Sequence, residues 1–197
     1  LQTLNERIIS RGLDPMHGMA VGPTVISHET TETELRGRWL IASTDQLGGH
    51  TPRPSPPPGS LASVQIHETL INNLLDQLDL AGTEYAIAEL REHLAGRLNR
   101  PEWAGTTTDN DDVRIAFAQE NPVRVSFQDG RMELHLNIAR LQREGQSWQR
   151  FQVKVRYTAE ADGLGIALQR DGVVELGGVS GAQIALRGIF GSVFSDE

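Results

Sequence analysis

The residues of this sequence that could do chemistry are few, and they stand far apart. His67 and Glu68 adjoin, but a zinc-protease helix needs a second histidine four residues after the first, and Ile71 stands there. The run DNDD at 109–112 offers oxygen atoms of the kind calcium prefers, yet it lacks the ligand spacing, the glycine and the closing glutamate of an EF-hand. We therefore interpret His67 and Glu68 as the polar rim of a helix, and 109–112 as a solvated loop.

Two glycine-containing stretches resemble known motifs only in part. GLGIAL at 163–168 lacks the third glycine and the following helix of a dinucleotide-binding fingerprint. GVSG at 178–181 is followed by Ala182, where a nucleophile elbow has glycine. We expect a non-enzymatic protein with no cofactor and no metal. The enzymatic alternative requires a polar cleft that gathers His67, Glu68 or the 109–112 acids beside a perturbed titratable group.

The composition narrows the class further. The chain has 197 residues, no cysteine and a net charge of −8. Thiol catalysis, disulfides and cysteine-based zinc sites are excluded, and the acidic balance argues against a nucleic-acid partner. No apolar run approaches the 18 residues of a membrane span. The chain starts at Leu1 without a signal segment, so we expect a processed chain or a fragment.

Helical periodicity is confined to the first half of the chain. It predicts a short helix at 3–13, a long amphipathic helix at 63–80 with Ile66, Leu70, Leu74 and Leu78 on one face, and a second helix at 84–99. Residues 19–43, rich in valine, threonine and isoleucine, predict a strand pair. The proline-rich stretch 48–60 indicates a strap or a linker. Within the long helix, Asn72 and Asn73 predict hydrogen bonds to a neighbouring loop, or a polar contact at a pocket mouth.

From Val113 onward, apolar residues recur with period two. Asp129-Gly130 predicts a type I′ turn between strands at 123–128 and 131–138, and further strands are expected at 151–157, 164–168, 173–176 and 182–188. The terminal segment 186–194 carries Ile189, Phe190, Val193 and Phe194, which indicates either closure of the core or an apolar docking surface.

These elements predict an α+β fold: a twisted antiparallel β-meander packed on one long amphipathic helix plus a second helix. We expect residues 1–60 to form an N-terminal helix and strand segment with the proline-rich strap, and residues 61–197 to form the helix-and-sheet domain, together one compact unit.

The order of helix and strands resembles a half-module of the tubular lipid-binding superfamily, the bactericidal/permeability-increasing type. The segments that carry the resemblance are VQIHETLINNLLDQL, NPVRVSFQDGRMELHLNIARL and FQVKVRYTAEA, within residues 62–160. That family wraps a curved antiparallel sheet around a long helix, has no catalytic residues and takes acyl chains into an apolar lumen. The resemblance implies a lumen lined by Leu70, Leu74, Val125, Phe127, Leu134, Leu136, Val153 and Val155.

Two functions follow as expectations. The first is a non-catalytic binding module for a lipid or another apolar small molecule, in the periplasm or the secreted space, with a cytoplasmic location as the alternative. The second is a structural or protein-interaction domain of a larger envelope protein, whose sheet is filled by its own side chains and which binds a protein partner or a second copy of itself.

Overall fold

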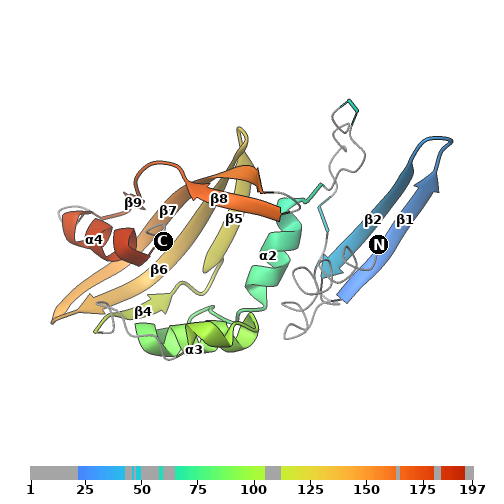
Figure 1. The fold of residues 1–197 in the computed structure, drawn as a ribbon. Coiled ribbons are helices and arrows are strands. Elements are labelled where there is room, and N and C mark those ends of the chain that lie inside the picture. The colour runs from blue at the N-terminus through green and yellow to red at the C-terminus, as the bar shows by residue number, and fades with distance from the viewer. Residues whose placement is uncertain are drawn as a thin grey trace. The chain divides into compact units, whose positions relative to one another are not determined.

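The computed structural model describes residues 22–42, 46, 48–49, 58–59, 65–104, 112–162, 165–179 and 183–193 (Figure 1). The chain divides into two compact units, Leu1–Gln77 and Leu78–Glu197. Helices and antiparallel sheets make up the described elements, so the predicted α+β class is confirmed. The helix expected at 3–13 and most of the proline-rich stretch lie outside the described residues. The described residues divide at 77/78, whereas we expected a boundary at 60/61.

The first unit contains a β-hairpin, as residues 19–43 predict. Strands β1 (Gly22–Thr30) and β2 (Leu35–Ala42) pair antiparallel, with a register shift between Val25 and Ser27 that leaves Ile26 as a bulge. The backbone N–H of Glu34 donates to Thr31 Oγ1 at 3.0 Å, which fixes the connection between the strands.

Helix α2 (Glu68–Asp76) has nine residues, so the prediction of one long helix over 63–80 was wrong. His67 caps the start of the helix, because its Nδ1 accepts a hydrogen bond from the backbone N–H of Thr69 at 3.2 Å. The backbone leaves the helix after Gln77, and Asp79 adopts the left-handed conformation with φ of 54°. Leu78, which we expected on the helix, is a core residue of the second unit.

Helix α2 packs on β2 within the first unit. The side chain of Asn73 is buried and donates through Nδ2 to the carbonyl of Ile41 at 3.4 Å. Gln46 donates in turn to the Asn73 carbonyl at 3.0 Å. The Asn73 side chain is thus hydrogen-bonded, but to strand β2 rather than to the loop that we expected. Coverage of the β-meander by this helix stays a prediction.

The second unit is built on one antiparallel sheet. Its strands are β3 (Glu84–Ala86), β4 (Arg114–Phe117), β5 (Val123–Gln128), β6 (Arg131–Arg143), β7 (Gln146–Asp162), β8 (Gly165–Arg170) and β9 (Glu175–Gly177). Its helices are α3 (Ile87–Arg97), the short 3-10 turn η3 (Pro101–Trp103) and α4 (Gln183–Val193). The first three residues of the helix predicted at 84–99 form a short strand instead, because they pair with β4. No helix in the described part of the chain has the length and hydropathy to span a bilayer.

The long hairpin β6–β7 is the centre of this sheet (Figure 1). Strands β4 and β5 pair in succession along β6, and β8 and β9 pair along β7. The predicted type I′ geometry is present between β5 and β6, where Asp129 and Gly130 have φ of 52° and 75°. Glu144 and Gly145, with φ of 48° and 79°, repeat it between β6 and β7.

A matched irregularity keeps one face of this hairpin apolar along its length. Ala139 and Arg150 drop out of the β6–β7 pairing, and Arg150 adopts a left-handed φ of 53°. Residues three apart, Ile138 and Leu141, are consequently both buried on β6. Since both strands shift together, neighbouring pairs keep their register.

Helix α4 closes the core of the second unit, so the strand expected at 182–188 was wrong. Leu186, Ile189 and Phe190 recur at helical spacing and are buried. The ring of Phe190 meets that of Phe151 edge-on, with centroids 6.2 Å apart. The prediction that the terminal apolar segment closes on the core is confirmed for Ile189 and Phe190, while the side chains of Val193 and Phe194 lie outside the description.

Candidate functional site

The richest cluster of ionisable side chains lies on the polar face of the second unit's sheet. Its members alternate with the buried residues of four neighbouring strands: Ser126 on β5, Glu133 and His135 on β6, Lys154 and Arg156 on β7, and Glu175 on β9. Antiparallel register places them side by side, because Glu133 pairs with Arg156, and Lys154 pairs with both His135 and Glu175. We call this set the polar-face cluster.

Ion pairs connect most of the polar-face cluster. Arg156 Nε donates to Glu133 Oε1 at 2.8 Å, and Arg156 Nη1 donates to Glu175 Oε1 at 2.6 Å. Lys154 Nζ lies 3.0 Å from Glu175 Oε2. The Glu133 side chain is only 13% exposed, so its carboxylate depends on these cations for compensation.

These contacts set the charge states of the cluster. The hydrogen bond from Arg156, helped by the charge of Lys154, holds the pKa of Glu133 below its usual value. The hydrogen bond from Lys154 likewise lowers the pKa of Glu175. The hydrogen bond to Glu133 raises the pKa of the Arg156 guanidinium. The two glutamates are therefore fixed anions, which are poor proton donors at neutral pH.

Ser126, His135 and Glu133 have the residue types of a catalytic triad but not its geometry. Ser126 Oγ and Glu133 Oε2 each lie 3.4 Å from the same ring nitrogen, His135 Nε2. A triad needs the acid on one imidazole nitrogen and the hydroxyl on the other, so that the proton can pass between them. Because Ser126 and Glu133 contact the same nitrogen of His135, no proton can pass from the hydroxyl through the ring to the carboxylate. The contacts of the cluster instead join neighbouring strands of the sheet.

Sequence reasoning missed the polar-face cluster because its members are distant along the chain. The available signal was the alternation of charged residues at 133 and 135 and at 154 and 156. Once the Asp129-Gly130 turn fixes the register, these positions fall opposite each other.

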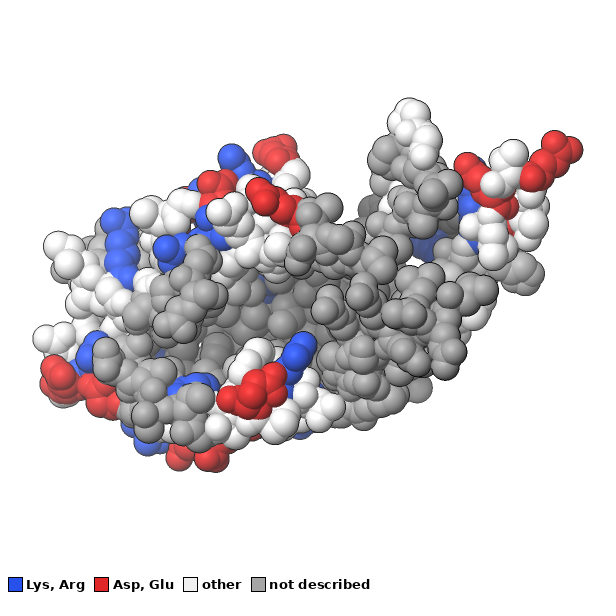
Figure 2. Space-filling model, in the orientation of Figure 1, with Lys and Arg blue, Asp and Glu red and all other residues white. Residues whose placement is uncertain are grey.

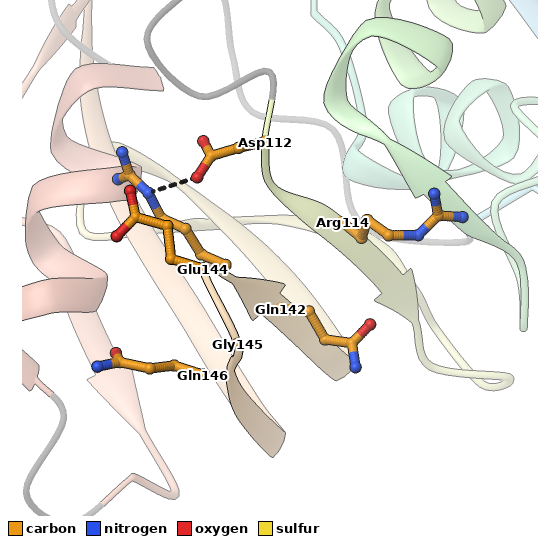
Figure 3. Close-up of a pocket in the computed structure, with 7 residues that line it drawn as sticks. Asp112, Arg114, Gln142, Glu144, Gly145 and Gln146 are labelled. Atoms are coloured by element: carbon orange, nitrogen blue, oxygen red, sulfur yellow. Dashed lines mark hydrogen bonds and ion pairs between the residues drawn. The ribbon is translucent and has the colours of Figure 1, made fainter.

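A polar depression of about 290 Å³ lies at the turn between β6 and β7. It is lined by Asp112, Arg114, Gln142, Arg143, Glu144, Gly145 and Gln146. Figure 3 shows that the labelled side chains point in different directions rather than toward one centre. Arg143 Nε donates to Asp112 Oδ2 at 3.2 Å. Asp112 is the described member of the 109–112 run, and a guanidinium already occupies the position that a cation would need.

Arg114, at the border of this depression, is held by a second ion pair. Its Nε donates to Glu84 Oε1 at 3.0 Å, and Arg140 reaches the same carboxylate across the small side chain of Ala116. Hydrogen bonds from Arg140 and Arg114 lower the pKa of Glu84. The depression thus offers paired charges and amides, and its lining contains no aliphatic or aromatic residue that would favour an acyl chain.

The structure brings six of the eight predicted lumen residues to one face of β5, β6 and β7. Val125 pairs with Leu134, which pairs with Val155, and Leu136 pairs with Val153. Val125, Val153 and Val155 are buried, while Phe127, near the β5–β6 turn, is 45% exposed. Leu70 and Leu74 are half-buried on α2, in the first unit.

His67 and Glu68, the other pair considered, serve the start of α2. His67 caps the helix, and Glu68 opens its first turn. Histidine and carboxylate side chains do not gather into a metal-binding group anywhere in the described ranges.

Among the described residues of the first unit, the most exposed apolar side chains lie on the β1–β2 hairpin. Val25 is 59% exposed and pairs directly with Trp39, which is 60% exposed; Leu35 is 78% exposed. A β-carbon placed on Gly37 would overlap the Trp39 ring, so the indole lies over Gly37 on the same face. We call Val25, Leu35 and Trp39 the hairpin apolar face.

Acidic side chains gather at the far end of this hairpin (Figure 2). Glu29, Glu32 and Glu34 are exposed there, and Arg36 Nη2 lies 2.5 Å from Glu34 Oε2. The sequence could not distinguish this hairpin from the core strands, because alternation looks the same whether or not a face is covered.

Comparison with known proteins gives no relative for this chain. No family model, no curated protein and no solved structure matches it. The resemblance to the tubular lipid-binding superfamily therefore stays a prediction.

Proposed function

We propose that the protein is a non-catalytic interaction domain that docks on a protein partner through the hairpin apolar face. The observation that carries this proposal is the exposure of the paired Val25 and Trp39 side chains. Exposed apolar groups that cluster on one face, and include an aromatic ring, are typical of binding surfaces.

The packing and the paired charges of the second unit also support a non-catalytic role. Around Val153 and Val155 its apolar sheet face is filled by its own side chains, to which α4 adds Phe190 against Phe151, and its polar face is held by the polar-face cluster. A self-filled core and a set of neutralised ion pairs favour the structural or interaction reading over catalysis.

The test is the stability of Leu35→Asp, measured by far-UV circular dichroism during thermal unfolding. A docking residue that is 78% exposed should tolerate the charge, with a change within about 0.5 kcal/mol. A loss of several kcal/mol would show that Leu35 belongs to a core, and would contradict the proposal.

A lipid-binding module, in the periplasm or the secreted space, is the second candidate. The exposure of Phe127 favours it, since the apolar face of β5–β7 reaches solvent at the β5–β6 end. Native mass spectrometry followed by organic extraction decides between the two functions. A co-purified lipid at one per chain supports the lipid-binding function, and a chain that stays unliganded after incubation with phospholipid vesicles contradicts it.

A further inference from the structure

The pairing register sorts the side chains of the β1–β2 hairpin onto two opposite faces. Leu35, Gly37 and Trp39 alternate along β2 on one face, with Val25 across from Trp39. The charged residues of the two strands with described side chains alternate onto the other face: Glu29 on β1, and Arg36 and Arg38 on β2. The hairpin is therefore an amphipathic ribbon.

Residues 48–49 pack on the charged face of this ribbon, while Asn73 of α2 bonds to the backbone carbonyl of Ile41. Arg38 Nη2 donates to the Gly49 carbonyl at 3.2 Å, and the Leu40 side chain lies against Gly48. Gly49 lies on the His67 ring, and its N–H donates to Thr69 Oγ1 at 3.0 Å. Residues 48–49 and the start of α2 thus pack on one side of β2, and the hairpin apolar face lies on the other side.

We infer that the hairpin apolar face is where two copies of this chain meet, face against face. This inference rests on the proposed docking function and names its partner as a second copy. The described side chains of the face carry no charge, so two copies can meet without burying an ion. The acidic end and the arginines of each copy stay on the outside, in water.

The area of the face agrees with a weak dimer. Val25, Leu35 and Trp39 together expose roughly 400 Å² per copy, so two copies bury at most roughly 800 Å², the size of a weak and transient contact. A two-stranded ribbon is marginal alone, and a second ribbon packed at about 10 Å turns it into a small two-layer sandwich. The contact is isologous, with the same patch on both sides, and it closes as a two-fold dimer.

Sedimentation velocity of the full chain, from about 1 to about 200 µM, tests the dimer over the micromolar range expected for an interface of this size. Leu35→Glu places two charges in each dimer interface and should raise the dissociation constant by ~100-fold or more. Ser27→Glu is the matched control, because it adds the same charge on the opposite face. Val25→Glu is a second variant on the apolar face.

A fluorescence measurement separates the failure of this inference from the failure of the proposed function. In a Trp103→Phe/Trp148→Phe chain, Trp39 is the single tryptophan, and acrylamide quenching reports its exposure. A dimer that shields Trp39 and is broken by Leu35→Glu, but not by Ser27→Glu, supports the inference.

Three other results overturn it. A monomer at every concentration with Trp39 readily quenched excludes self-pairing and leaves a foreign partner for the docking face. A monomer with Trp39 shielded shows that the chain covers its own face, and overturns the docking function as well. A dimer that survives both Leu35→Glu and Val25→Glu uses another surface.

Discussion

Hairpins β1–β2 and β6–β7 share one pattern of alternating apolar residues but differ in how far those residues are buried. In β6–β7 the alternating apolar residues are buried or half-buried, and Val153 is 0% exposed. In β1–β2 the same alternation leaves Leu35 78% exposed. The difference lies in what covers each face: α4 closes the first, while residues 48–49 pack on the charged side of the second. An alternating strand therefore predicts a two-faced ribbon, and its packing partner decides whether that ribbon is core or contact surface.

The largest predicted difference in stability comes from placing an aspartate at an alternating apolar position of each hairpin. Val153→Asp buries an unpaired carboxylate in the core and should cost about 4 kcal/mol or more, enough to prevent cooperative folding of the second unit. Leu35→Asp, studied at about 1 µM, the low end of the range expected for a weak dimer, should melt like the parent chain. Far-UV circular dichroism measures both. Equal losses from the two variants would erase the distinction between the hairpins.

Aromatic truncation should give the next largest contrast. Phe190→Ala removes a buried ring that packs edge-on against Phe151, and should cost about 3–5 kcal/mol. Trp39→Ala removes a ring that lies over Gly37 and faces solvent, so its cost should be about 1 kcal/mol or less. Urea unfolding gives both values. A Trp39→Ala cost as large as that of Phe190→Ala would place Trp39 in a core.

Acid should destabilise the filled sheet through the polar-face cluster. Folding lowers the pKa of Glu133 and Glu175 below the ordinary 4.5, so the unfolded chain binds more protons in this range. Their stabilisation is complete well above pH 4.5 and is lost as the pH falls through the lowered folded values. Glu133→Gln should flatten this acid-side loss, at a cost in stability smaller than that of Phe190→Ala.

The hairpin offers the matched control for that measurement. Glu29 is exposed and lies 3.9 Å from Arg36, so water and salt screen the pair. Between pH 6 and pH 3, the urea midpoint should fall nearly as far in Glu29→Gln as in the parent chain, and less far in Glu133→Gln. The reverse order would mean that the cluster on the sheet does not hold its carboxylates as described.

The two turns give the smallest predicted effects. Gly130 has φ of 75°, and alanine there should cost about 1 kcal/mol because a β-carbon strains the left-handed backbone. Thr31→Ala removes the side-chain acceptor of Glu34 N–H in an exposed turn, and should cost about 0.5 kcal/mol. Denaturant midpoints rank the two, and a larger loss at Thr31 would show that the β1–β2 turn is the more constrained.

Local rules predicted much of the sheet. Asp129-Gly130 fixed the β5–β6 turn and, with period two, placed six of the predicted lumen residues on one face. The helix predicted at 63–80 was too long at its C-terminal end. The leucine pattern continues to Leu80, whereas the backbone at Asp79 is already left-handed. The phase shift at Ala139 and Arg150 was missed, because an arginine with positive φ has no local signal.

The candidate sites were harder to predict than the elements. The polar-face cluster depends on cross-strand register, and the exposure of Trp39 depends on what packs against the hairpin. Neither of these is a property of neighbouring residues in the sequence.

Thiol labelling of two matched valines tests the contrast between the hairpins most directly, because the chain has no cysteine of its own. Val25→Cys and Val155→Cys place one thiol on each alternating face, at positions 59% and 1% exposed. In dilute protein, the thiol at position 25 should react within about tenfold of its rate in the unfolded chain. The thiol at position 155 should react at least about a thousandfold more slowly than in the unfolded chain. Strong protection of position 25 under dilute conditions, or rapid labelling of position 155, would contradict the account.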